Sequence, residues 1–343
     1  MNTKRHILAV LGLVAVLAAA LASTASARVS DAHIVGAGSS FVFPLVSQWV
    51  PALGTAYGIS LTYAPVGSGA GIAQITARTV DFGASDAPLT PDQFSACKGC
   101  VQIPWALGAT SVVYHLSGVN KQVHVTGSVL ADIYLGKITS WDDPALKAIN
   151  PGVTLPATKI TPVYRSDNSG TSYNFTDYLT NISPAWRSKY GRGVNLSWPA
   201  GQGGRGSSGV SAVVRSTEGS IGYVDIAYAL ANKLQVSAVK NAAGKYVTPG
   251  IKQIAAAAST IKSVPAGNEL HIVNPSAKNP AAYPICTFTY VIIPTKTSKA
   301  ADLRRMVFWA LTKGQSFGPK LLFVPVPKVV LAASEKTLQQ VQA

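Results

Sequence analysis

From residue 33 onward, short hydrophobic runs alternate with amphipathic segments. Residues 33–36 and 59–64 are strand-like, whereas residues 44–57 and 71–79 place their apolar positions at helical spacing. The alternation continues, with strands expected at 81–85, 110–116, 160–164, 221–224 and 287–293 and helices at 128–135, 172–181, 209–216 and 301–311. Strands that alternate with helices in this way predict an α/β fold.

The first 27 residues form a unit of a different kind. Lys4 and Arg5 precede an uncharged apolar run at residues 7–22, and small residues occupy positions 25–27. This three-part layout is typical of a cleavable signal peptide, although the apolar run is near the lower length limit of a transmembrane anchor. We therefore expect residues 1–27 to be removed. The mature chain is then a soluble protein of the periplasm or another compartment outside the cytoplasm.

The rest of the chain is long enough for about two domains, at roughly 150 residues per domain. The 343 residues are 48% hydrophobic, which suits a folded protein. The net charge is +15, but the 29 Lys and Arg residues are scattered singly. Neither a basic run nor a basic patch with interleaved aromatic residues indicates nucleic-acid binding. We interpret the charge as favouring solubility, with weak attraction of anions as the alternative.

The three cysteines do not suggest a metal site. Cys97 and Cys100 form a C-x-x-C pair, and Cys286 stands alone in an apolar run. No second pair and no nearby histidine completes a ligand set, so we expect neither metal nor cofactor. In an oxidising compartment a local disulfide between Cys97 and Cys100 is the simpler interpretation. Cys286 is expected to be a buried thiol.

One local pattern occurs three times: a strand ends in a Gly- and Ser-rich loop that opens a helix. The loops lie at residues 36–41, 67–71 and 165–171. Each offers free backbone N–H groups, the positive end of a helix and hydroxyl donors, a combination that binds oxyanions. The same residue types are also ordinary helix caps and turn residues. Three such loops in one exported chain strengthen the case for an anion site, and both interpretations stay open at this point.

Two charged residues narrow the choice of anion. Arg165 can present a planar, bidentate fork to an oxyanion, and Asp167 can orient that fork or form only a surface ion pair. Asp86 lies in the segment DFGASDAP and would repel a fully ionised anion, unless it simply caps the turn before Pro88. An ionised carboxylate accepts a proton that monohydrogen phosphate carries and sulfate lacks, so Asp86 favours phosphate.

Other sequence matches are weak. Residues 201–206 fit G-x-G-x-x-G literally, but no strand is expected before them, so we interpret them as a mobile loop near the mouth of a cleft. No G-x-S-x-G elbow marks a nucleophilic serine. Asp142 and Asp143 are better interpreted as caps of the following helix than as a catalytic pair. We therefore do not expect an enzyme.

Six segments together resemble the periplasmic phosphate-binding proteins of phosphate ABC transporters: GAGSSF, VGSGAG, DFGASDAP, DIYLGKITSWDD, RSDNSGTS and GSIGYVDIAYA. The similarity runs from about His33 to the segment FVPVPKVV near the C-terminus, and DFGASDAP and RSDNSGTS are its most specific parts. The resemblance implies a type II periplasmic-binding-protein fold, in which two α/β lobes joined by hinge strands close on phosphate in the cleft.

The resemblance also implies the ligand set, by matching motif positions. The implied phosphate contacts are Ser40, Phe41, Ser68, Asp86, Arg165, Ser169, Gly170 and Thr171, with Asp167 supporting Arg165. Family members often have threonine at the position of Ser40, which keeps the hydroxyl. Proline usually follows the phenylalanine, whereas Val42 and Phe43 intervene here before Pro44, so the path into the first helix is expected to differ.

The sequence thus predicts two lobes, one of residues 28–112 plus 287–343 and the other of residues 113–286. The function expected is high-affinity binding of inorganic phosphate outside the cytoplasm and its delivery to an ABC-type permease. Only the resemblance supplies the permease subunits as partners; we expect no nucleic-acid partner and a monomer. The alternatives are a binding protein for another oxyanion, a phosphate sensor or scavenger, and, with less support, a secreted phosphatase.

Overall fold

A computed structural model describes residues 32–343, so the signal-peptide prediction for residues 1–27 lies outside the described residues. The first part of the chain forms β1 (His33–Gly38), α2 (Phe43–Tyr57), β2 (Ser60–Ala64), α3 (Ser68–Thr76), β3 (Phe82–Ser85), α4 (Pro91–Cys97) and β4 (Cys100–Tyr114). The last part forms β12 (Cys286–Pro294), α12 (Ala300–Leu311), two short 3-10 helices (Lys313–Phe317 and Pro319–Leu321) and α13 (Lys328–Leu338).

The middle of the chain contains shorter elements. In order they are β5 (His124–Val125), α5 (Gly127–Tyr134), α6 (Pro144–Ile149), β6 (Thr161–Arg165), α7 (Gly170–Ile182), α8 (Pro184–Lys189), β7 (Gln202–Gly204), α9 (Gly206–Ser216), β8 (Ser220–Asp225), α10 (Ile226–Ala231), β9 (Gln235–Val236), β10 (Ala238–Lys240), β11 (Tyr246–Val247) and α11 (Ile251–Ala258). The predicted α/β fold is confirmed. From residue 32 on, no helix is both long and apolar enough to cross a membrane.

One mixed sheet runs through the molecule in the order β2-β1-β3-β12-β4-β8-β6-β7. The strands β1, β2 and β3 are parallel to one another, as are β6, β7 and β8. Between these two parallel groups, β12 and β4 pair antiparallel with each other and with their outer neighbours. A separate sheet of three short strands has the order β11-β10-β5.

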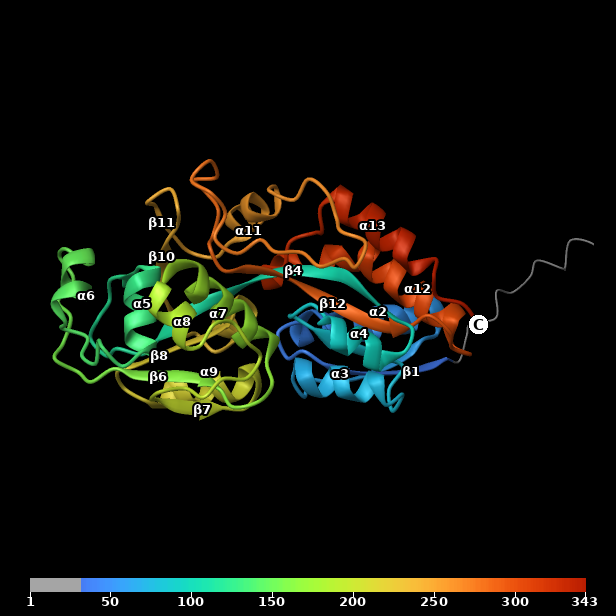
Figure 1. The fold of residues 1–343 in the computed structure, drawn as a ribbon, viewed down its shortest axis with the longest axis horizontal. Coiled ribbons are helices and arrows are strands. Elements are labelled where there is room, and N and C mark those ends of the chain that lie inside the picture. The colour runs from blue at the N-terminus through green and yellow to red at the C-terminus, as the bar shows by residue number, and fades with distance from the viewer. Residues whose placement is uncertain (1–31) are drawn as a thin grey trace, which may run out of the picture.

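The long strand β4 links the two halves of this sheet. Its first part, from Cys100 to Ala109, pairs with β12, and its last part, from Thr110 to Tyr114, pairs with β8. Figure 1 shows β4 extending from the N- and C-terminal segments, in blue and red, towards the middle segments in green and yellow. All of its residues are buried. The division into two lobes stays a prediction. Its boundaries near residues 112 and 286 lie in β4 and at the start of β12.

Each half of the sheet packs on its own aromatic cluster. In the half formed by the chain ends, the rings of Trp49 and Phe82 lie 5.1 and 5.8 Å from Trp105. In the other half, the rings of Phe175 and Tyr223 stack with centroids 4.3 Å apart. Buried aromatic rings contribute large apolar areas to folding, so these clusters help to stabilise both halves of the sheet.

The interpretation of residues 201–206 as a loop was wrong. Gln202–Gly204 forms β7, which pairs in parallel with β6, and α9 begins at Gly206. Glycine is needed here because β7 and α9 pack very closely. A Cβ on Gly204 would lie 2.5 Å from the backbone nitrogen of Val210. The segment therefore carries a strand–turn–helix unit that apolar periodicity did not reveal.

The expectations for the three cysteines and for Asp143 agree with the structure. Cys97 and Cys100 are joined in a disulfide, and Cys286 is a buried free thiol. Asp143 caps α6 by accepting the N–H of Ala145 at 2.8 Å, as predicted. Asp142, predicted with it, instead accepts a hydrogen bond from Ser140 Oγ at 2.5 Å. No group of His, Cys, Asp or Glu among the described residues could hold a metal ion.

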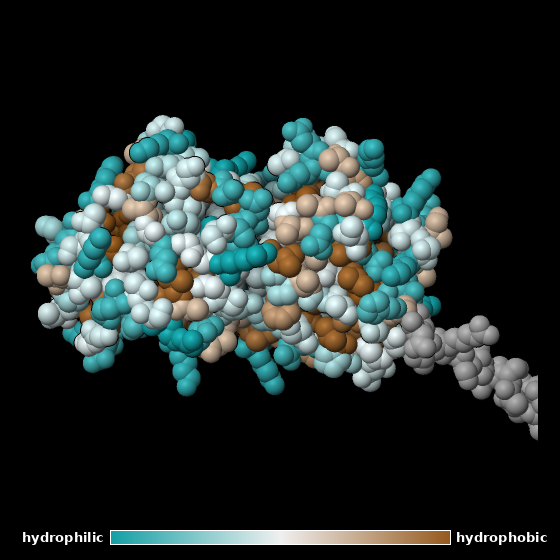
Figure 2. Space-filling model, turned by 90° about the horizontal axis from the view of Figure 1, so that it is seen from below, coloured by the Kyte–Doolittle hydropathy of each residue, from teal (hydrophilic) through white to brown (hydrophobic). Residues whose placement is uncertain are grey.

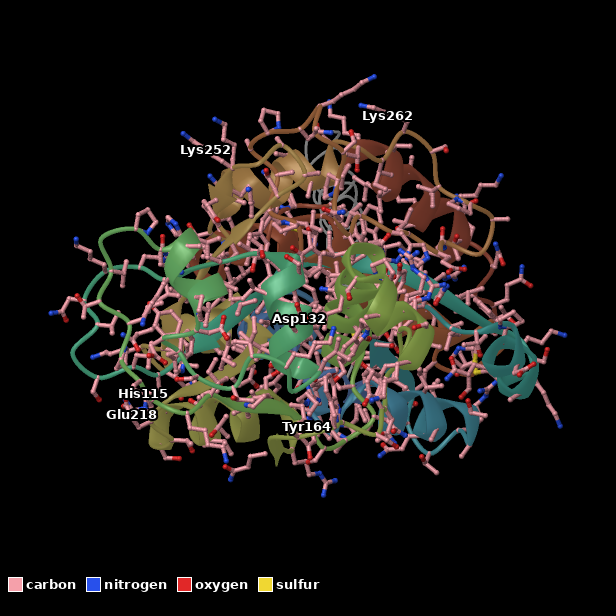
Figure 3. The ribbon with its side chains drawn as sticks, turned by 60° about the vertical axis from the view of Figure 1, so that its left-hand side comes forward. His115, Asp132, Tyr164, Glu218, Lys252 and Lys262 are labelled. Atoms are coloured by element: carbon pink, nitrogen blue, oxygen red, sulfur yellow. A yellow bond between two sulfur atoms is a disulfide. The ribbon has the colours of Figure 1, made fainter. Side chains whose placement is uncertain are left out.

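Figure 2 shows hydrophilic residues interspersed with single hydrophobic ones on one face of the molecule. Lys252 and Lys262 project outward, and His115 and Glu218 lie side by side, with Nε2 and Oε2 3.8 Å apart (Figure 3). The interpretation that the net charge favours solubility stays a prediction.

Candidate functional site

The three Gly- and Ser-rich loops meet where the two halves of the molecule approach each other. The first follows β1, the second opens α3 and the third lies between β6 and α7. The N–H of Gly69 donates to the carbonyl of Asn168 at 2.9 Å, which joins the second loop to the third. A Cβ on Gly170 would lie 2.6 Å from Ser68 Oγ and 2.7 Å from the backbone nitrogen of Asp86. The loops of opposite halves are therefore in close contact.

Five buried backbone N–H groups in these loops have no hydrogen-bond partner within residues 32–343. They belong to Ser40, Phe41, Ser68, Gly170 and Thr171. The last three occupy the first turns of α3 and α7, where no helix carbonyl is available as a partner. Orphaned buried N–H groups are rare in folded proteins, so five in one place form a set of donors for an anion.

The side chains of the predicted residues add further donors. The hydroxyls of Ser40, Ser68, Ser169 and Thr171 are at most 3% exposed. Ser169 caps α7 by accepting the N–H of Ser172 at 3.1 Å, which leaves its own proton available. Phe41 differs, because its ring is wholly buried against Phe323, with centroids 5.8 Å apart. Phe41 can therefore serve the site only through its backbone.

Arg165 is the cation of the site and is held by Asp167. Its Nε and Nη2 donate to the two carboxylate oxygens of Asp167 at 2.7 and 2.6 Å, and Nη1 donates to Thr171 Oγ1 at 3.3 Å. An arginine has five N–H groups, so two remain for a ligand. Partial burial raises the pKa of Asp167, but the hydrogen bonds and charge of Arg165 outweigh it, and the pKa lies below its usual range. Asp167 thus stays ionised and fixes the fork.

Asp86 is a buried carboxyl group in the middle of these donors. It is 2% exposed, and Ser39 Oγ donates to its Oδ1 at 2.5 Å. Burial raises the pKa of Asp86 to about 7, against the lowering effects of the Ser39 hydrogen bond, the Arg165 charge and Ser68. An ionised Asp86 only accepts hydrogen bonds. The site therefore suits a tetrahedral anion that still carries a proton.

Three further residues join the site that the sequence did not single out. Ser39 lies in the first predicted loop, but its bond to Asp86 is visible only in the fold. Ser207 lies at the start of α9, and its backbone N–H donates to Ser40 Oγ at 3.0 Å. Asp225 ends β8 and is 1% exposed. The glycine-rich segment before Ser207 was the available signal, and Asp225 lies in the segment GSIGYVDIAYA, which carried the family resemblance without pointing to this residue.

Comparison with known proteins gives matches along most of the chain. The PBP superfamily domain matches residues 22–306. The phosphate-binding protein PstS of Xylella fastidiosa is 41% identical over 304 residues, which covers 88% of this chain and 83% of that protein. PstS of Pasteurella multocida is 35% identical over 334 residues, covering 96% of this chain and 94% of that protein.

Solved structures share the fold at lower sequence identity. A high-affinity periplasmic phosphate-binding protein (PfluDING) bound with phosphate superposes with a TM-score of 0.74 at 20% identity, covering 89% of this chain and 93% of that one. A phosphate-binding protein of Stenotrophomonas maltophilia gives a TM-score of 0.69 at 22% identity, with the same coverage. At these identities the likeness is one of fold.

Proposed function

The chain belongs to the PBP superfamily and, within it, to the phosphate-binding proteins named PstS, and from this membership we propose that it binds inorganic phosphate outside the cytoplasm and delivers it to an ABC-type membrane permease. The relatives are binding proteins, so no covalent step is invoked. The observation that carries the proposal is the set of five buried N–H groups, near Arg165 and Asp86, that have no partner among residues 32–343.

The ligand contacts we propose are those implied by the motifs: Ser40, Phe41, Ser68, Asp86, Arg165, Ser169, Gly170 and Thr171. Backbone N–H groups, hydroxyls and the free fork of Arg165 donate to the phosphate oxygens, and Asp86 accepts the phosphate proton. Asp167 holds Arg165 in position. Sulfate offers no proton to Asp86, and a site that depends on one hydrogen bond can reject the ligand lacking it by about 10⁴-fold.

Closure of the two predicted lobes follows from where the donors lie. Ser40, Ser68 and Asp86 belong to one half of the sheet, and Arg165 and the start of α7 belong to the other. A phosphate ion can contact both sets only when the halves are together, so it binds the closed arrangement better and shifts the population towards it. The permease is then expected to recognise the closed, phosphate-loaded form.

Calorimetric titration of the mature protein, stripped of bound anions, tests the proposed function. We expect tight binding of phosphate at pH 8 and sulfate binding weaker by at least about a thousandfold, because Asp86 faces sulfate without a proton between them. A chromogenic phosphate ester should not be hydrolysed. Equal affinities for the two anions would favour a general oxyanion-binding protein, and substantial turnover of the ester would favour an enzyme.

Gly170→Ala should weaken phosphate binding by about 10- to 100-fold, since over-packing of this kind costs about 1–3 kcal/mol. The added methyl would lie 2.7 Å from the backbone nitrogen of Asp86, which cannot move aside without separating the two halves. Gly267→Ala is the matched control, because no heavy atom lies within 4 Å of its Cβ position. Calorimetry would compare the two variants, and equal affinities would contradict the proposed closure.

A further inference from the structure

Asp225 is a buried carboxyl group beside the site with one oxygen unaccounted for. Its Oδ1 caps α10 by accepting the N–H of Tyr228 at 3.2 Å. Its Oδ2 has no hydrogen-bond partner within the described part of the chain, although the residue is only 1% exposed. A capping role accounts for the first oxygen and leaves the second unexplained. Unsatisfied buried polar atoms are uncommon and call for a physical explanation.

Ser207 lies between Asp225 and the ligand loop. Its hydroxyl is close enough to the Asp225 carboxyl to lower the pKa of that group. On its other side, Ser207 Oγ lies 3.1 Å from Ser40 Oγ, and the backbone N–H of Ser207 donates to the same Ser40 oxygen at 3.0 Å. All three side chains are at most 3% exposed. Asp225, Ser207 and Ser40 therefore lie in a short polar row that reaches across the contact between the halves. In the structure Ser207 is hydrogen-bonded to Ser40, whereas Asp225 Oδ2 beside it has no partner among the described residues.

The direction of the hydrogen bonds along this polar row decides where the hydroxyl proton of Ser40 points. A serine hydroxyl donates one hydrogen bond and accepts two. If Asp225 is in the acid form and donates to Ser207, then the hydroxyl and the N–H of Ser207 can both donate to Ser40 Oγ. Both acceptor positions of Ser40 are then filled, and its own proton is free for a ligand. An ionised Asp225 would instead draw the Ser207 proton and leave Ser40 donating to Ser207.

We propose that Asp225 is a positioning residue of the phosphate site, whose acid form donates to Ser207 and so directs the hydroxyl proton of Ser40 towards the bound anion. This inference rests on the proposed function, because it assigns Ser40 to phosphate. It adds the start of α9, through Ser207, as a fourth segment that prepares the site.

The surroundings of Asp225 favour its acid form. Burial and the nearby charge of Asp86 raise the pKa of Asp225 well above its usual value, while the hydrogen bond from Tyr228 and the hydroxyl of Ser207 lower it only in part. The charged or titratable groups around it are Asp86, Tyr228 and, through Tyr228, Arg165 and Tyr63. Of these only Arg165 is a cation, and Asp167 already pairs with it.

Phosphate titration of four variants of the mature protein tests the inference. Asp225→Ser keeps a helix cap but cannot reach Ser207, and Ser207→Ala interrupts the polar row. Each variant should bind phosphate about tenfold more weakly than wild type, as expected when one hydrogen bond to a charged ligand is misdirected. Asp225→Asn keeps the cap and supplies an amide N–H in place of the acid O–H, so it should stay within about threefold of wild type. The double variant Asp225→Ser/Ser207→Ala should bind phosphate no more weakly than either single variant, because both substitutions interrupt the same polar row.

Ser211→Ala is the matched control, since Ser211 is equally buried on α9 and its hydroxyl has no partner among the described residues. Its phosphate affinity should be unchanged, and thermal unfolding should show that all variants are folded. Affinities of Asp225→Ser and Ser207→Ala within twofold of wild type would overturn the inference. So would an Asp225→Asn variant as weak as Asp225→Ser. Failure of the wild-type protein to bind phosphate would instead overturn the proposed function, and this inference with it.

Discussion

Replacing Arg165 by methionine should weaken phosphate binding by about 10³-fold or more. Arg165 is 2% exposed and, with two N–H groups left free by Asp167 and Thr171, can make two charge-assisted hydrogen bonds to the ligand. Each such bond contributes about 1.5–3 kcal/mol, and about 1.4 kcal/mol changes an affinity tenfold. Calorimetric titration with phosphate would measure the loss directly.

The same substitution should also destabilise the protein, by about 3 kcal/mol, because it leaves the largely buried Asp167 without its cation. Urea unfolding followed by tryptophan fluorescence would measure this. Arg165→Lys keeps the charge but not the fork, and should lie between wild type and Arg165→Met. Lys137→Met is the control: Lys137 pairs with Asp132 at 3.1 Å and both side chains are exposed, so its loss should change neither quantity much. Phosphate affinity of Arg165→Met within tenfold of wild type would be incompatible with the proposed site.

Local sequence signals were enough to predict most of the residues that the fold brings together at the candidate site. Each ligand loop is a continuous segment in which a strand ends, glycines allow a turn and hydroxyl residues open a helix, and β1, β6 and α7 begin or end within two residues of the predicted positions. Ser40, Ser68, Arg165 and the start of α7 were therefore identified together with their donor groups. That Ser68 stands on the first turn of α3 was not foreseen, because the helix was expected to begin at residue 71.

The residues that the sequence missed are those whose role depends on another part of the fold. Ser39 becomes significant only because β3 places Asp86 beside it. Ser207 and Asp225 lie in segments far apart along the chain and meet because α9 and β8 pack together. The segment before Ser207 was misinterpreted because glycines carry no hydrophobic periodicity. In β7 they serve close packing, which a sequence pattern does not reveal.

The position of β4 shows a related limit. Its apolar run predicts a strand, but the expected start was residue 110, whereas the strand begins at Cys100 and contains Pro104. Proline normally argues against a central strand, and here the register with β12 shifts next to it, between Thr289 and Tyr290. An irregularity in a paired strand tolerates the missing N–H. The sequence pattern of one strand does not show how its partner strand is irregular. The full length of β4 could therefore be seen only in the structure.

Asp86→Asn should remove most of the discrimination between phosphate and sulfate. The amide can donate to an oxyanion, whereas the ionised carboxylate only accepts, so sulfate should gain about 100-fold in affinity while phosphate loses about tenfold. The ratio of the two affinities at pH 8 should thus shrink by about a thousandfold, within the range that a single hydrogen bond can control. Calorimetry with both anions would measure the ratio. Asp81→Asn is the control, because Asp81 pairs with Lys299 at 2.8 Å outside the site.

The pH dependence of sulfate binding separates this role of Asp86 from a merely structural one. Because burial raises the pKa of Asp86 to about 7, the group is mainly ionised at pH 8 and mainly protonated at pH 5.5. In the protonated form it can donate to sulfate, so the wild-type affinity for sulfate should rise as the pH falls through 7. Asp86→Asn has no proton to gain at this position, and its sulfate affinity should stay nearly constant over the same range. Parallel pH profiles of the two proteins, or an unchanged phosphate-to-sulfate ratio in the variant, would show that Asp86 does not select the ligand by its proton.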